Sequence, residues 1–375
     1  MPEPFKNLFN PDMIALMGSH LSRVSNQFDR SGFIEIATRD IESLELKQRS
    51  DQIRKALHAC LPPDFADAGT ILLSALHPQD DVDLSELTMD KRGIRGWATM
   101  PMADYVADTG LGHFDHGMEI LKDLTKRGTS ELAVRAFILE DPSRAMRHMG
   151  QWARDPNYHV RRLASEGCRP RLPWAVRLPV FVADPEPVIN VLERMKDDDK
   201  EYVRRSVANN LNDIAKDHPD RVARIAAEWM KGATPERKKL VRHACRTLIK
   251  QGHEATLRAL GFGEALVSLE RLEIKTPIVQ YGSALEFEFD LASLSADEQA
   301  LIFDYIVHHR KASGDTSPKV FKGKTFSLAA EESMTIAKKH GMRPITTRVY
   351  YPGIHALEIQ INGASIGRAE FELVM

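Results

Sequence analysis

The chain has 375 residues, of which 43% are hydrophobic and 28% are charged, and its formal net charge at pH 7 is −2. This length predicts two or three domains, and the composition excludes disorder over most of the chain. No apolar run approaches the roughly 20 residues of a membrane-spanning helix, and no secretory signal is expected. Three widely separated cysteines argue against a disulfide framework or zinc cage and indicate a reducing cytoplasm.

Residues 1–265 are predicted to be helical throughout. In segments such as 11–28 and 219–232, apolar residues recur at spacings of three and four, which is the period of an amphipathic helix. Proline and glycine separate these segments, as they do at helix ends. The first domain is therefore predicted to be mainly α-helical.

The helices of this region are predicted to repeat. HVRRLASEG (159–167) aligns with YVRRSVANN (202–210) at an offset of 43 residues, and the weaker copy LVRHAC (240–245) follows 38 residues later. ELAVRAF (131–137) is a fourth candidate copy. A period near 40 is typical of HEAT-like helical hairpins, which stack into a curved solenoid with a concave face.

Residues 266–375 are predicted to form an immunoglobulin-like β-sandwich. LEFEFDL (285–291) alternates apolar and acidic residues, as a half-buried strand does. An Asn362-Gly363 pair joins two strand-like runs, which is a strong hairpin signal. Six or seven short strands are expected here, including 301–309 and 324–328.

One predicted helix carries a carboxylate between two arginines. Arg162, Glu166 and Arg169 fall at positions i, i+4 and i+7, on a stripe separate from the apolar packing face. Such groups are often solvated ion pairs worth about 0.3–0.5 kcal/mol. The alternative is a functional site that requires a carboxylate held between cations.

Two further copies show a similar pattern. Arg205, Asn209 and Asp213 line up in the next repeat, and Glu131 and Arg135 form an i, i+4 pair near a helix start predicted at residue 129 or 130. Three successive repeats would then each present an acid with an arginine nearby.

The segment 134–177 is rich in arginine. It contains nine arginines and no lysine, opposed by four acids. Arginine suits bidentate contact with phosphate, so a basic stripe on a solenoid is a candidate nucleic-acid surface. The alternative is a helical domain that merely uses arginine. Within the stripe, CRPRLPW (168–174) is a stiff loop that presents Arg169, Arg171 and Trp174.

The runs 152–174 and 197–222 resemble the HEAT-repeat DNA alkylation repair glycosylases, and within them the AlkC branch. The segment 113–137, the opening MPEPFKNLFN and the β-domain also fit that branch, so the resemblance covers essentially the whole chain. It implies an enzyme that hydrolyses the N-glycosidic bond of cationic alkylated bases, 3-methyladenine and 3-methylcytosine in this branch. It also implies that the lesion is not flipped into a pocket, unlike the usual glycosylase behaviour.

The implied mechanism agrees with the residue types. A cationic base is already a good leaving group, and a carboxylate can stabilise the oxocarbenium-like sugar and orient a water. The family pattern places these acids at Glu131, Glu166 and Asp213. The chain departs from the AlkD branch, which has a tryptophan where Asn209 or Asn210 falls, so an aromatic cradle is in doubt. The candidate DNA contacts are Arg162, Arg169, Arg171, Trp174, Arg205, Asn209, Lys319, Lys322 and Lys324.

The expected partner is double-stranded DNA containing alkylated bases, bound by a monomer without a cofactor or metal. His113 and His116 have a ligand-like spacing but lack a third ligand. The β-domain would hold DNA through a basic loop within 308–324, or would simply cap the last repeat. Two other functions stay open: a non-catalytic HEAT scaffold binding protein or nucleic acid, and a silent lesion sensor. Convergence of the three acids distinguishes the enzyme from the scaffold.

Overall fold

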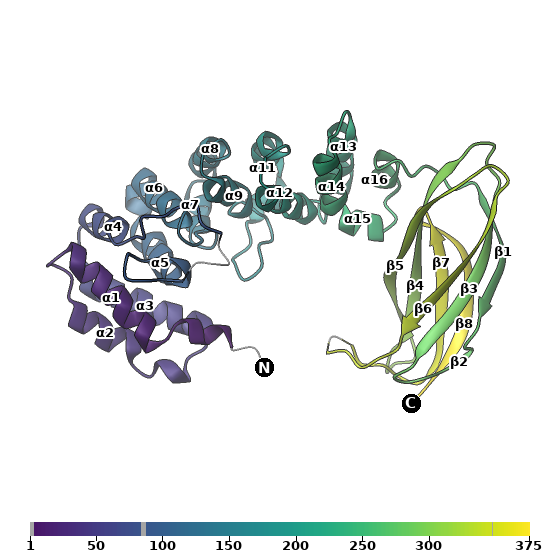
Figure 1. Ribbon diagram of the computed structural model, residues 1–375, viewed down its shortest axis with the longest axis horizontal. Helices are drawn as coiled ribbons and strands as arrows, with labels where there is room; N and C mark the ends of the chain where they lie inside the picture. Colours follow the sequence, from purple (N-terminus) through teal and green to yellow (C-terminus); the bar gives the residue numbers. More distant parts are fainter. Residues whose placement is uncertain (1–3, 84–87, 347) are drawn as a thin grey trace. The chain divides into compact units, whose positions relative to one another are not determined.

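The computed structural model describes residues 4–83, 88–346 and 348–375, and the chain forms two compact units that divide between Ile214 and Ala215. The first unit is helical, and the second contains further helices followed by β-strands (Figure 1). The predicted order of helical repeats followed by a β-sandwich is confirmed. Within the described ranges, no helix has the length and apolar character needed to cross a membrane.

The helices of the first unit follow one another through short connections and several 3-10 turns. Their bounds are η1 (Phe5–Leu8), α1 (Pro11–Val24), α2 (Arg30–Thr38), η2 (Ile41–Ser43), α3 (Leu46–Cys60), α4 (Phe65–Ser74), η4 (Gly96–Ala98), α5 (Thr99–Thr109), η5 (Leu111–His113), α6 (Phe114–Thr125), α7 (Val134–Glu140), α8 (Pro142–Trp152), α9 (Tyr158–Glu166), α10 (Pro179–Ala183), α11 (Glu186–Leu192), η6 (Glu193–Met195) and α12 (Glu201–Ile214).

The last repeats of this unit form two rows of helices. Figure 1 shows α8 and α11 in one row, with α9 and α12 in the other. Two residues stabilise the N-terminus of α8. Asp141 caps the helix by accepting a hydrogen bond from the backbone N–H of Arg144, and Pro142 occupies its first turn. Asn157 caps α9 in the same way. The repeat predicted from the sequence is therefore a pair of packed hairpins.

Apolar stripes hold α9 and α12 together. Val160 and Leu163 of α9, and Val203, Val207 and Leu211 of α12, are essentially completely buried. Burying each such side chain stabilises the fold by about 1.5–3 kcal/mol. The packing faces fix how the remaining faces of the two helices are turned, and so they position the polar side chains discussed below.

The second unit begins with helices and continues as a sandwich of two sheets. Its strand orders are β1-β3-β6 and β2-β8-β7-β4-β5, antiparallel except for the parallel pair β2 and β8. The bounds are α13 (Pro219–Met230), α14 (Pro235–Ala244), α15 (Arg246–Lys250), α16 (Glu254–Ala259), β1 (Val267–Ile274), β2 (Ile278–Gln280), β3 (Ala284–Ser293), β4 (Gln299–Arg310), β5 (Thr316–Leu328), β6 (Ser333–Gly341), β7 (Gly353–Ile361) and β8 (Ala364–Val374).

The sandwich core follows the predicted alternation. Every second residue of β3 is buried, including Phe287 and Phe289, and these rings pack against Phe303 and Tyr305 of β4. The predicted hairpin is also present, because Asn362 and Gly363 both adopt positive φ between β7 and β8. The described residues form eight strands rather than the six or seven expected.

The prediction that the basic segment 308–324 is a loop is wrong. Residues 308–324 form the end of β4, a tight turn, and most of β5, so Lys319, Lys322 and Lys324 lie on a strand. The segment has the composition of a loop for two reasons: it contains the turn around Gly314, and its strand lies exposed at the edge of the sheet, where polar residues are common. The lysines therefore project from a paired strand with a fixed register.

The predicted domain limit between residues 265 and 266 falls between the end of α16 and the start of β1. The compact units divide earlier, because the last helices contact the sandwich. Gly252, between α15 and α16, packs so closely on Gly363 that a Cβ at Gly363 would lie 2.6 Å from the Cα of Gly252. The limit at 265 stays a prediction about independent domains.

Buried histidines are an unusual feature of the sandwich. His309 is 5% exposed, and neither ring nitrogen has a hydrogen-bond partner within the described part of the chain. Burial lowers its pKa to about 3, assisted by Arg348, His355, His340 and Lys319. Burial likewise lowers the pKa of His340 to about 4. Both rings are therefore neutral at pH 7.

The histidines predict an acid-labile sandwich. Below pH 6.5 the unfolded chain binds protons that the folded chain does not, so stability is complete above 6.5 and falls toward pH 4. Each ring is expected to cost about 2 kcal/mol at pH 5 relative to pH 7.5. His309→Phe keeps an aromatic ring and should remove about half of this loss. Urea unfolding of the full chain at both pH values measures it, and equal pH dependence of the two proteins contradicts it.

Candidate active site

Two arginines join three carboxylates into one row. The Nη1 of Arg162 donates to Glu131 at 2.7 Å, and its Nη2 lies 3.8 Å from Glu166. The Nη1 of Arg169 donates to Glu166 at 2.6 Å, and its Nε donates to Asp213 at 2.9 Å. We call these five side chains the carboxylate row. The structure therefore brings together the three acids predicted from the sequence.

The carboxylate row is built from consecutive repeats. Glu131 lies in the turn before α7, Arg162 and Glu166 lie on α9, Arg169 follows the end of α9, and Asp213 lies on α12. The two residues on α9 are one helical turn apart, which sets them on one face. Contacts between α9 and α12 then bring Arg169 and Asp213 together.

Burial distinguishes this row from a surface ion pair. The exposed fraction of the side chain is 16% for Glu131, 17% for Arg162, 7% for Glu166, 9% for Arg169 and 3% for Asp213. The alternative of solvated pairs is therefore wrong for these residues. Removing charges from water costs several kcal/mol each, and close opposite charges offset that cost. The most accessible edge is formed by Glu131 and Arg162.

Glu166 stays ionised although it is buried. Burial alone would raise its pKa, but the charges of Arg162 and Arg169 and a hydrogen bond from Ser206 outweigh burial and lower it. The Ser206 Oγ lies 2.6 Å from Glu166 Oε2, and 2.5 Å from the hydroxyl of Ser165. The same attraction raises the pKa of Arg162, with Glu131 contributing most against burial.

Ser206 was missed by the sequence reasoning, although a signal existed. Ser206 and Asn210 interrupt the apolar stripe of Val203, Val207 and Leu211, so they had to be buried with α9. The Nδ2 of Asn210 donates to the carbonyl of Ser165 at 2.7 Å. A polar residue on a buried stripe is expected to bond a neighbouring element.

Arg135 has a role other than the predicted pairing with Glu131. Helix α7 begins at Val134, later than predicted, and the Arg135 side chain turns into the protein, where it is fully buried. It donates to the carbonyls of Gly167 and Arg169, at 3.0 and 2.8 Å, and to that of Val176. This guanidinium therefore fixes the loop after α9, from which Arg169 reaches the carboxylate row.

The same loop presents Trp174. This side chain is 66% exposed, and its residue has a φ of 66°. The Nζ of Lys47 donates to its carbonyl at 2.6 Å, which ties the loop to α3. Trp174 also lines a pocket of about 390 Å³ with Leu132, the neighbour of Glu131. Trp152, in contrast, is buried in the repeat core.

Tyr202 of α12 adds an aromatic face to the row. The guanidinium of Arg162 lies 5.0 Å from the centre of its ring, within the range of a cation–π contact. Its hydroxyl oxygen is buried and has no hydrogen-bond partner among the residues that the structure describes. Burial raises the pKa of this phenol, so it is neutral and can donate.

The other predicted contacts lie outside the carboxylate row. Arg205 is exposed and pairs with Glu201 at 3.4 Å on α12. Arg171 and Asn209 are partly buried. The three lysines belong to β5 in the second unit. Their predicted role in binding DNA stays a prediction.

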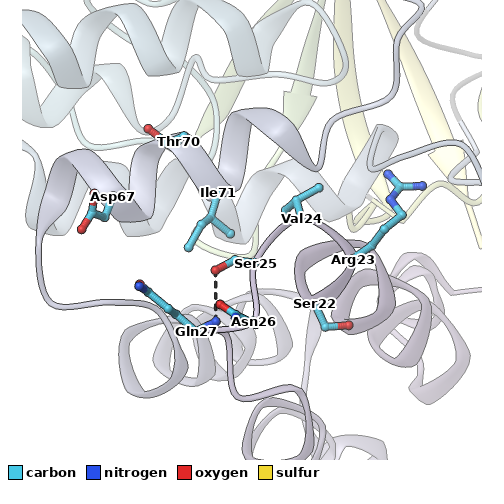
Figure 2. Close-up of a pocket in the computed structure, with 9 residues that line it drawn as sticks. All are labelled: Ser22, Arg23, Val24, Ser25, Asn26, Gln27, Asp67, Thr70 and Ile71. Atoms are coloured by element: carbon cyan, nitrogen blue, oxygen red, sulfur yellow. Dashed lines mark hydrogen bonds between the residues drawn. The ribbon is translucent and has the colours of Figure 1, made fainter.

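Another hollow of the first unit contains none of the predicted site residues. Figure 2 shows this hollow, of about 540 Å³, between the end of α1 and α4, where Arg23 and Asp67 are the charged lining residues. In the described ranges, no group of three or more histidine, cysteine, aspartate or glutamate side chains is arranged to hold a metal. His113 and His116 instead pack against the ring of Phe65, at 5.2 and 5.6 Å.

Known proteins resemble this chain over its full length. A family model described as the C-terminal Ig-like domain of the uncharacterised protein YhaZ matches residues 268–375. Uncharacterized protein YhaZ of Bacillus subtilis is 33% identical over 371 residues, covering 98% of this chain and 99% of the relative. The structure of Pseudomonas fluorescens alkylpurine DNA glycosylase AlkC, bound to DNA containing an abasic site analog, is 36% identical, covers both chains completely and gives a TM-score of 0.86. The chain therefore belongs to the family of YhaZ and the alkylpurine DNA glycosylase AlkC.

Proposed function

We propose that the protein is a monofunctional DNA glycosylase that hydrolyses the N-glycosidic bond of cationic alkylated bases, such as 3-methyladenine and 3-methylcytosine, in base excision repair. The carboxylate row carries this proposal, because it gathers three predicted acids in a chain 36% identical to AlkC throughout. The substrate is double-stranded DNA, bound by a monomer in the cytoplasm.

The charge of the row suits the chemistry. Three carboxylates and two guanidinium groups form the row, and at its more accessible edge the carboxylate of Glu131 lies beside Arg162. Departure of a cationic base leaves positive charge on the sugar, and no general acid is needed. A carboxylate charge that came within about 4 Å of that cation would attract it by about 4 kcal/mol at an effective dielectric constant of about 20. This is comparable with the contribution of one preorganised group in other enzymes.

The accessible edge of the row defines the approach of the sugar. Glu131 and Arg162 lie there, while Glu166 and Asp213 lie deeper. We infer that the sugar meets the row at this edge and that a carboxylate also orients the attacking water. The base stays outside the row, so flipping it into a pocket is unnecessary.

Contacts with the rest of the duplex are assigned to exposed or partly exposed groups. Arg171, Trp174, Arg205 and Asn209 belong to the loop after α9 and to α12, the elements that build the row. Lys319, Lys322 and Lys324 of β5 would contact backbone phosphates through the second unit. Each phosphate contact is expected to contribute to the salt dependence of binding.

Base release tests this function. Pure protein is incubated with a duplex containing 3-methyladenine, and free base and strand cleavage are measured separately. The expected result is free 3-methyladenine together with an intact, alkali-labile strand, because no lyase step takes place. If folded protein released no base, the proposal that it is an enzyme would be overturned. Tight binding to the lesion duplex without release would favour the silent sensor, and absence of lesion preference would favour the scaffold.

A further inference from the structure

The arginine-rich segment 134–177 divides into groups with different surroundings. Arg162 and Arg169 belong to the carboxylate row, and Arg135 donates its hydrogen bonds to backbone carbonyls. Arg144 pairs with Asp115, and Arg161 pairs with two aspartates, 198 and 199. The segment is therefore not one basic stripe, and its remaining arginines need a separate explanation.

Arg147 and Arg154 face a groove on the other row of helices. The groove lies between α8 and α11, has a volume of about 870 Å³, and is lined by Ser143, Met146, Arg147, Gly150, Gln151, Arg154, Pro187, Asn190, Val191 and Arg194. On each helix these positions recur at spacings of three and four, so they form two facing stripes. The α8 side extends for roughly 16 Å at 1.5 Å per residue.

The groove is positively charged. Three arginines line it and none of its lining residues is acidic. Arg147 and Arg154 are exposed, and neither side chain makes an ion pair with another residue in the described part of the chain. Arg194 reaches across to the carbonyl of Gly150, which fixes its guanidinium at the groove while leaving other N–H groups available.

The base of the groove is apolar. Its lining includes Met146 from α8 and Pro187 and Val191 from α11, which are half-buried or buried, whereas the three arginines are exposed. A phosphate backbone would cover this surface without using it, since phosphate binding needs only cations and N–H donors. An amphipathic peptide uses both, with apolar side chains against the base and carboxylates against the arginines.

We propose that the α8–α11 groove docks an acidic, amphipathic segment of a partner protein. This site is additional to the proposed catalysis, because the carboxylate row is built on the turn before α7, on α9 with the loop after it, and on α12, whereas α8 and α11 form the other row of helices. A bound partner would leave the site available for DNA. The groove fits about three helical turns of such a segment.

Fluorescence anisotropy with a synthetic peptide tests the proposal. The probe is a labelled helix-forming peptide of about 15 residues with leucine and phenylalanine on one face and glutamate and aspartate elsewhere. The full-length protein is expected to bind it, and Arg147→Glu/Arg154→Glu should weaken binding by at least about tenfold. Arg224→Glu, which changes an exposed arginine of α13, is the matched control and should bind like wild type.

Further arms separate the contributions of charge and apolar surface. Met146→Gln keeps every arginine and is expected to weaken peptide binding at least threefold. A second peptide, in which glutamine and asparagine replace the acidic residues, should not bind. Base release by all groove variants should equal that of wild type. Equal peptide binding by wild type and the double arginine variant would overturn the proposal. A loss of duplex DNA binding by that variant, without loss of peptide binding, would assign the groove to nucleic acid instead.

Discussion

Replacing Arg169 by glutamine is expected to lower the free energy of unfolding by about 3–5 kcal/mol, because this guanidinium neutralises two buried carboxylates. Without it, Glu166 and Asp213, whose side chains are 7% and 3% exposed, would remain ionised with little solvent. The pKa of Glu166 should then rise, because Arg169 is one of the groups that lower it. The loss of stability should therefore be largest near pH 8 and should shrink as the pH falls and Glu166 protonates.

Urea unfolding of Arg169→Gln, followed by the helical circular-dichroism signal at pH 8 and pH 5, measures this effect. Arg205→Gln is the matched control, because Arg205 pairs with Glu201 on the surface, with exposed fractions of 62% and 54%. That control should change stability by less than about 1 kcal/mol. Equal destabilisation by both substitutions, or a loss that grows as the pH falls, would contradict the charge balance described for the row.

Replacing Glu166 by glutamine is expected to slow base release by at least about 100-fold while the protein stays folded. Glutamine keeps the size and a hydrogen-bond acceptor for Arg169, but it removes one of the negative charges by which the row stabilises the sugar cation. Wild-type release should persist as the pH falls to about 5, since the pKa of Glu166 lies below the ordinary 4.5.

Single-turnover release from a 3-methyladenine duplex measures the effect of Glu166→Gln. Glu193→Gln is a suitable control, because Glu193 is a half-exposed acid of the same unit that pairs with Lys196. It should release base at the wild-type rate. If Glu166→Gln slowed base release by less than about threefold, Glu166 would not be a catalytic residue.

Much of the fold was predictable because hydrophobic periodicity is local. The period of β3 and the Asn362-Gly363 turn are properties of short stretches, and both are found as predicted. Of β5, only the end at 324–328 was predicted as a strand, and the rest was missed for a different reason. It lies at the edge of its sheet, and most of its residues are exposed. Because neither face of the strand is mostly buried, its sequence lacks the alternation of apolar and polar residues that marks a strand. Only pairing with β4 makes it a strand.

The candidate site was predictable in its acids and less so in its contacts. The one-turn spacing of Arg162 and Glu166 on α9 follows from helix geometry. The repeat pattern also singled out Glu131 and Asp213, and the family resemblance implied that all three acids are catalytic. Which arginine meets which acid depends on how neighbouring repeats pack. Glu131 therefore pairs with Arg162, 31 residues away, and not with Arg135 as its spacing suggested. Ser206 was hidden for the same reason.

The central claim is that the carboxylates act as one group on the sugar. A double-mutant cycle of Glu166→Gln and Asp213→Asn tests it most directly, with single-turnover base release measured for both single variants and the double variant. Each amide keeps an oxygen that accepts from Arg169, and circular dichroism checks folding. The account predicts that the double variant is no more than about threefold slower than the slower single variant, because groups that act as a unit are not additive. Losses that multiply, or single variants that retain wild-type rates, would contradict it.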